Sequence, residues 1–155
     1  MYKQIVVGTD GSTGASLAVD AALELARLTG ATLHVVSAHA AHNAFQLAAA
    51  APEVAVPVDA ILASNDAIEA EAQRACKQVV EQANGVGVHA EVHCVPGDAA
   101  DALIRVAQDT ESDLVVVGNR GMTGVRRFVL GSVPNKLSHH CPSSLLIVDT
   151  ASARS

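Results

Sequence analysis

The residues best suited to bind an anion lie in one stretch near the end of the chain. Residues 118–131 contain four glycines and three arginines: Gly118, Gly121, Gly124, Gly131, Arg120, Arg126 and Arg127. Glycines let the backbone turn tightly and let a ligand approach the amides. Guanidinium groups match phosphate oxygens in charge and geometry, and free amides in turns or at helix starts bind anions. The stretch therefore predicts a phosphate-binding loop.

The charge distribution agrees with this prediction. The chain has a formal net charge of −6, yet no Asp or Glu occurs between Asp113 and Asp149. That interval also holds Lys136, His139 and His140. A local positive field in an acidic protein favours a small anion over nucleic acid, which typically requires a basic domain. Charge alone is equally consistent with arginines that only solvate a loop, so that alternative stays open.

Length and composition limit the class of protein. At 155 residues, we expect one domain over residues 1–150 and a short tail over 151–155. The three aromatic residues, Tyr2, Phe45 and Phe128, are too few for base-stacking platforms. We expect no secretion signal, and the sequence shows no apolar segment of the roughly twenty residues that span a bilayer. We expect a cytoplasmic protein with three reduced cysteines and no nucleic-acid or membrane partner.

Apolar runs and helical periodicities alternate along the chain. Strands are expected at residues 5–7, 32–38, 88–95, 114–117 and 145–149. Helices are expected at 13–30, 68–85, 98–107 and 132–140. Residues 40–64 lack clear periodicity and are expected to form a loop or irregular arm, with room for one helical turn around 44–51. The alternation predicts an α/β fold, an open parallel sheet with helices on both faces.

The glycine spacing is specific. Gly118-x2-Gly121, nine residues, then Gly131-Ser132 resembles the G-x2-G-x9-G-S/T signature of the nucleotide-binding branch of the universal stress protein family. The resemblance extends to the opening strand and turn at 5–12 and to the closing helix and strand at 131–148. It implies a Rossmann-like sheet of five parallel strands in the order 3-2-1-4-5, which handedness rules allow.

In that strand order the chain changes direction between the first and fourth strands. Ligands of open α/β sheets bind at such a switch point, outside the carboxyl ends of the strands. In the family, positions matching Gly8, Asp10 and Ala38 approach the adenosine, and those matching the glycine signature approach ribose and phosphates. The expected nucleotide-binding residues are Gly8, Thr9, Asp10, Ala38, Val117, Gly118, Arg120, Gly121, Arg127, Gly131, Ser132 and Val133. Arg120 stands where the family often has His.

Several of these residues also have a purely structural interpretation. Asp10 can hold ribose hydroxyls or a metal near phosphate, or it can form an Asx-turn that starts a helix. Ser132 can bind phosphate or serve as a helix N-cap. His39 and His42 have a metal-like spacing but lie at the Ala-rich arm. His89, Glu91 and His93 share one face of an expected edge strand, which we interpret as solvated, so no metal or catalytic residues are assigned.

The resemblance implies a stress-response protein that binds an adenine nucleotide, with ATP as the first candidate and Mg²⁺ as its companion left open. We expect a homodimeric sensor or reservoir, paired through the apolar last strand from Leu145 to Val148. Hydrolysis should be slow at best, because only Asp10 offers a general base and no Walker-type magnesium site is present. The alternatives are an AMP or cyclic-nucleotide binder, a slow ATP-hydrolysing enzyme, and a ligand-free interaction dimer.

Overall fold

A computed structural model describes residues 1–40, 49–50, 53–119 and 130–150 of the chain. Strands and helices alternate along it, as the sequence predicts. In order they are β1 (Gln4–Gly8), α1 (Thr13–Thr29), β2 (Thr32–His39), α3 (Val58–Gly85), β3 (Ala90–Pro96), α4 (Ala99–Asp109), β4 (Leu114–Gly118), α5 (Ser132–His140) and β5 (Ser144–Val148). No helix among the described residues is long and apolar enough to cross a membrane.

The five strands form one sheet in the order β3-β2-β1-β4-β5, and every pair is parallel. This confirms the predicted fold class and strand order. The central strand is β1, in which Val7 pairs with Val35 of β2 and with Val116 of β4. The carboxyl ends of β1 and β4 are therefore neighbours. The strand order reverses at this point, because β2 and β3 lie on one side of β1, and β4 and β5 lie on the other.

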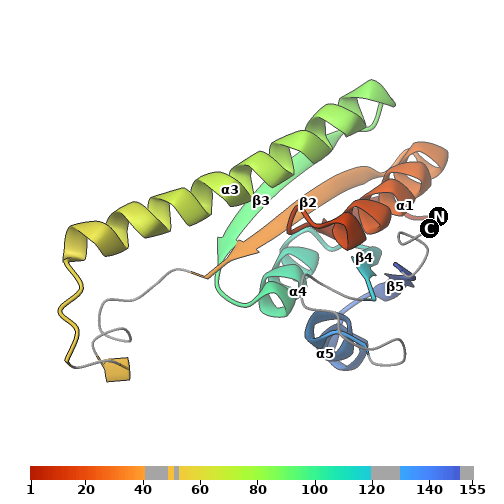
Figure 1. The fold of residues 1–155 in the computed structure, drawn as a ribbon. Coiled ribbons are helices and arrows are strands. Elements are labelled where there is room, and N and C mark those ends of the chain that lie inside the picture. The colour runs from red at the N-terminus through yellow and green to blue at the C-terminus, as the bar shows by residue number, and fades with distance from the viewer. Residues whose placement is uncertain (41–48, 51–52, 120–129, 151–155) are drawn as a thin grey trace.

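Alternate residues of the strands supply two hydrophobic cores, one on each face of the sheet. Ile5 and Val7 are fully buried with residues of α1 and α3, whereas Val6 is fully buried with residues of α4 and α5. Figure 1 shows α3 lying along the β2–β3 side of the sheet, α5 near β5, and α4 between them beside α5. Each such Val or Ile contributes about 1.5–3 kcal/mol of burial free energy, so the β-branched runs fix the positions of the strand ends.

Helix ends follow the expected capping chemistry. The Ser12 hydroxyl accepts a hydrogen bond from the Ala15 amide at 3.2 Å, and the Asp98 carboxylate accepts one from the Asp101 amide at 3.0 Å. Gly30 ends α1 in the left-handed region, at φ 69°, where a side chain would be strained. These caps place the start of α1 directly after β1 and the start of α4 directly after β3.

The predicted start of the long second helix was wrong. α3 begins at Val58 rather than near Ile68, so residues 58–64 do not belong to an irregular arm. Ile61 is the only buried residue of α3 before Ala72, and these early turns therefore carry no apolar stripe that periodicity could detect. Residues 49–50 are helical, and the other positions of the turn expected at 44–51 lie outside the described residues. The tail at 151–155 also lies outside them.

Candidate nucleotide site

The turns that follow β1 and β4 lie side by side. A Cβ built on Gly8 would come within 3.7 Å of Val117 Cγ1 and within 3.3 Å of Leu103 Cδ1. The Thr9 amide donates to the Val36 carbonyl at 2.9 Å, which brings the end of β2 alongside the same turn. The structure thus places five predicted site residues at the carboxyl ends of neighbouring strands: Gly8, Thr9, Ala38, Val117 and Gly118.

The loop after β4 is closed at its base by Asn119. The Gly131 amide donates to the Asn119 carbonyl at 2.9 Å, and the Asn119 amide donates to the Val148 carbonyl at 2.9 Å. The Asn119 side chain also bonds the Asp149 carboxylate at 2.8 Å and accepts from the Thr150 hydroxyl at 2.6 Å. The two ends of the glycine-rich stretch therefore meet beside the carboxyl end of β4. Sequence reasoning did not assign Asn119, because an Asn in a turn has no distinctive signature.

Helix α5 begins directly after this closure, and its first amides have no acceptor within the helix. Its N-cap is Gly131, which makes no side-chain capping bond, and Ser132 is the first helical residue. The interpretation of Ser132 as N-cap was therefore wrong by one position. Helix geometry leaves the amides of Ser132 and Val133 without an intrahelical acceptor, and Pro134 has no N–H to offer. Two amides and one exposed hydroxyl are thus available at this helix start for an anion.

Asp10 takes part in the structural turn that was the alternative to ligand binding. Its Oδ1 accepts from the Ser12 amide at 2.9 Å, which makes an Asx-turn, and the Thr9 hydroxyl accepts from the Gly11 amide at 3.3 Å. Because a carboxylate has about four acceptor positions, the turn leaves capacity for ribose hydroxyls. Asp10 is exposed just after the carboxyl end of β1, so it can form the turn and bind a ligand at the same time.

The positive charge near the site is smaller than the sequence indicates. Lys136 of α5 pairs with Asp101 at 2.7 Å and with Asp98 at 3.2 Å, and these hydrogen-bonded carboxylates raise the pKa of Lys136. The charge of Lys136 is therefore balanced by α4 and does not belong to a free positive field. Arg120, Gly121, Arg126 and Arg127 lie outside the described residues, so their predicted contacts stay predictions.

One buried polar atom beside Ala38 lacks a partner. Within the described part of the chain, Nδ1 of His39 is buried and makes no hydrogen bond. His39 is the last residue of β2, and its carbonyl accepts from the Gly97 amide at 2.9 Å. An unpaired buried nitrogen costs free energy. His39 follows Ala38 in the strand, so its side chain lies on the opposite face of the sheet, and we do not assign it to the site.

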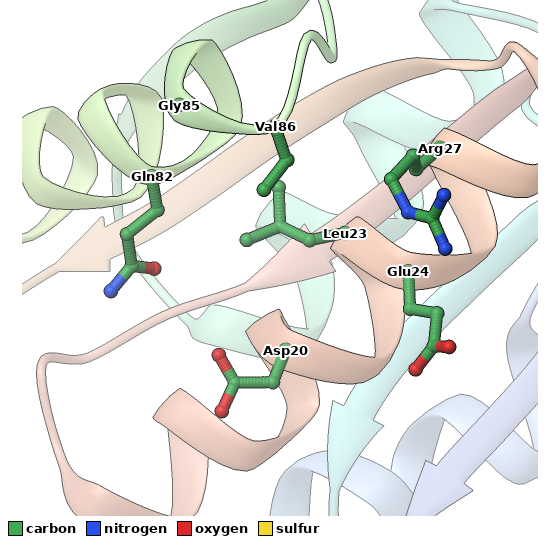
Figure 2. A pocket seen from close by; sticks show the side chains of 7 residues that line it. All are labelled: Asp20, Leu23, Glu24, Arg27, Gln82, Gly85 and Val86. Carbon is green, nitrogen blue, oxygen red and sulfur yellow. The ribbon is translucent and has the colours of Figure 1, made fainter.

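A separate cleft of about 500 Å³ lies between α1 and the end of α3. Figure 2 shows Leu23 and Val86 on facing sides of this cleft, with Asp20, Glu24 and Arg27 along α1. None of these residues belongs to the turns that follow β1 and β4. The cleft has no backbone amides at a helix start, and its two carboxylates disfavour phosphate, so we do not assign it to nucleotide binding.

An open parallel sheet with glycine-rich turns at its switch point defines a Rossmann-like α/β protein. The family model "Universal stress protein family" matches residues 1–149 of the chain. The chain therefore belongs to the universal stress protein family, as its motifs indicate.

Individual relatives resemble it over nearly their whole length. The chain is 30% identical over 149 residues to universal stress protein YxiE of Bacillus subtilis (strain 168), covering 96% of this chain and 99% of that protein. It is 33% identical over 158 aligned positions to universal stress protein Rv1636 of Mycobacterium tuberculosis (strain ATCC 25618 / H37Rv), covering 96% and 97%. A crystal structure of a universal stress protein in complex with cAMP superposes with a TM-score of 0.71 at 28% identity, covering 97% of this chain and 99% of that one.

Proposed function

We propose that this protein binds an adenine nucleotide where β1, β4 and α5 meet. The observation that carries the proposal is the 2.9 Å hydrogen bond from the Gly131 amide to the Asn119 carbonyl. This bond joins the start of α5 to the residue that follows β4, and β4 pairs with β1. Open α/β sheets bind ligands at the carboxyl ends of such strands. The cAMP held by a structural relative at 28% identity supports an adenine compound as the ligand.

The number of phosphate groups that the site can bind depends on its hydrogen-bond donors. Two amides and the Ser132 hydroxyl suit one phosphate group, and further phosphates require the additional charge of Arg120 and Arg127. ATP is the first candidate because the glycine-rich stretch supplies these arginines, with Mg²⁺ as a companion to its phosphates. A cyclic nucleotide is the second candidate, favoured by the cAMP complex of the relative, and it needs only the single-phosphate position.

Calorimetric titration with ATP, AMP and cAMP tests the proposal and ranks the candidates. Arg127→Ala should weaken ATP binding several-fold more than cAMP binding, whereas Ser132→Ala should weaken all three. Arg105→Ala removes an exposed arginine of α4 and serves as the matched control, with no change expected. The proposal fails if the folded wild-type protein gives no binding signal with any of the three compounds.

We further propose that the protein acts in the cytoplasm as a homodimeric sensor or reservoir with at most slow hydrolysis. β5 pairs with β4 on one side, and its side chains from Leu145 to Val148 are only half buried. A second copy can pair with its other edge about a two-fold axis. Leu146→Asp should yield monomers in size-exclusion chromatography with light scattering. Val92→Asp, a charge on the opposite edge strand β3, is the control and should leave the dimer intact.

A further inference from the structure

Three potential metal ligands meet on one face of the β2–β3 pair. The strand register places His34 opposite Glu91 and Val36 opposite His93, so the three polar side chains lie on the same face. Nδ1 of His34 is 3.1 Å from Nε2 of His93 and 3.5 Å from a carboxylate oxygen of Glu91. All three ligand atoms lie within 4.8 Å of one another. Sequence reasoning grouped His89, Glu91 and His93 as a solvated edge face and did not include His34.

A hydrogen bond to Gln4 fixes the tautomer of His34 and leaves one ring nitrogen free to bind an ion. Its Nε2 lies 2.8 Å from Oε1 of Gln4. An amide oxygen only accepts, so Nε2 carries the proton and the lone pair of Nδ1 points toward His93 and Glu91. A metal-bound histidine held by an outer hydrogen-bond acceptor is the usual arrangement in metal sites.

The two separations measured from His34 Nδ1 are close to those between ligands of a tetrahedral ion. Two ligands bound at about 2.0–2.1 Å in tetrahedral geometry are roughly 3.3–3.4 Å apart. The two distances from His34 Nδ1, 3.1 and 3.5 Å, bracket that value. We propose that His34, Glu91 and His93 form a binding site for a divalent first-row transition ion, with Zn²⁺ as its representative.

The exposure of the ligands indicates an open site. The side chain of His34 is only 5% exposed, whereas that of Glu91 is 51% exposed, so the solvent side of the ion would be completed by water. His89 lies 3.5 Å from the other carboxylate oxygen of Glu91 and can orient it. Two imidazoles favour Zn²⁺, Cu²⁺ or Ni²⁺ over Mg²⁺ and Ca²⁺, which take oxygen ligands. Because Gln4 begins β1 and Gly8 ends it, this site is distinct from the nucleotide site.

The test is titration of nucleotide-free, reduced protein with Zn²⁺ alone, followed by Co²⁺ as a spectroscopic probe. We expect one Zn²⁺ per chain and no binding of Mg²⁺. Bound Co²⁺ should give visible bands of a nitrogen- and oxygen-ligated ion without sulfur charge transfer. His93→Ala and Glu91→Gln should each weaken Zn²⁺ binding at least about tenfold, because outer-shell changes alone typically cost that much.

The control is the double variant His139→Ala with His140→Ala. These neighbouring, exposed residues of α5 have ring centroids 6.4 Å apart and form the other pair of neighbouring histidine rings that the structure describes. Their removal should leave the Zn²⁺ affinity unchanged. Glu91 is exposed, so Glu91→Gln keeps the fold if His93→Ala does not. The proposal is overturned if Glu91→Gln binds Zn²⁺ as tightly as wild type, if the loss occurs in the control, or if wild type binds no Zn²⁺.

Discussion

The two candidate sites of this protein differ in the atoms that would bind the ligand. At the carboxyl ends of β1 and β4, the described donors are mainly backbone amides, at Ser132 and Val133, held by a backbone hydrogen bond between Gly131 and Asn119. At the β2–β3 pair, the donors are side-chain atoms of His34, Glu91 and His93. A backbone site accepts any anion that fits its turns, whereas a side-chain site is selective through ligand type and tautomer. We therefore expect a substitution at one site to change binding there and to leave binding at the other site unchanged.

The largest expected effect concerns the hydrogen bond that fixes the His34 tautomer. Gln4→Leu removes the acceptor of His34 Nε2 and should weaken Zn²⁺ binding about 10–100-fold. Gln4→Glu is the matched variant, because a carboxylate acceptor raises the basicity of the ligating nitrogen and should preserve or strengthen binding. Calorimetry with Zn²⁺ measures both variants. Equal Zn²⁺ affinities for the Leu and Glu variants would contradict the role of Gln4, and nucleotide affinity should change in neither.

The strand ends that border the candidate nucleotide site could be predicted from sequence because their information is local. The glycine spacing lies within one stretch, and the β-branched runs before Gly8 and Gly118 fix the ends of β1 and β4. The histidine cluster could not be predicted in this way, because 57 positions of sequence separate His34 from Glu91 and only the β2–β3 register joins them. The start of α3 was missed for a related reason, since its early turns bury only Ile61 and leave no apolar period to detect.

Two glycines of the candidate nucleotide site, Gly8 and Gly131, should respond differently to substitution. A Cβ on Gly8 would meet Leu103 Cδ1 at 3.3 Å and Cδ2 at 3.4 Å, and Leu103 is buried. Gly8→Val should therefore lower the free energy of unfolding by about 1–3 kcal/mol through overpacking, and Gly8→Ala by less. Urea denaturation at constant m value measures both. An unchanged midpoint for Gly8→Val would show that Leu103 moves aside without cost.

At Gly131 the expected change is in binding rather than in stability. Its φ of −60° is allowed for every residue, so no backbone strain arises on substitution. Gly131→Val places a branched side chain beside the open amides of α5 and should weaken nucleotide binding several-fold, while Zn²⁺ binding stays unchanged. Gly131→Ala should weaken nucleotide binding less. If Gly131→Val unfolds the protein at the temperature of the titration, this glycine serves the fold and the contrast with Gly8 is lost.

The smallest expected effect links the first strand to pH. The Asp113 carboxylate accepts from the amides of Lys3 at 2.6 Å and Gln4 at 2.9 Å, and these bonds, that of Lys3 first, lower the pKa of Asp113. A lowered folded-state pKa means that this stabilisation is fully present above the unfolded value of about 3.9. It is lost as the pH falls through the folded value.

Asp113→Asn should therefore have a lower melting temperature than wild type at neutral pH, and the difference should shrink as the pH falls below about 4. Thermal unfolding monitored by circular dichroism across this range measures it. Glu111→Gln, a change at an exposed carboxylate two residues earlier, is the matched control. Because Asp113 anchors the backbone of Gln4, its loss should also weaken Zn²⁺ binding slightly and leave nucleotide binding alone. A melting difference that stays constant from neutral pH to below pH 4 would show that the carboxylate charge is not what holds the start of β1.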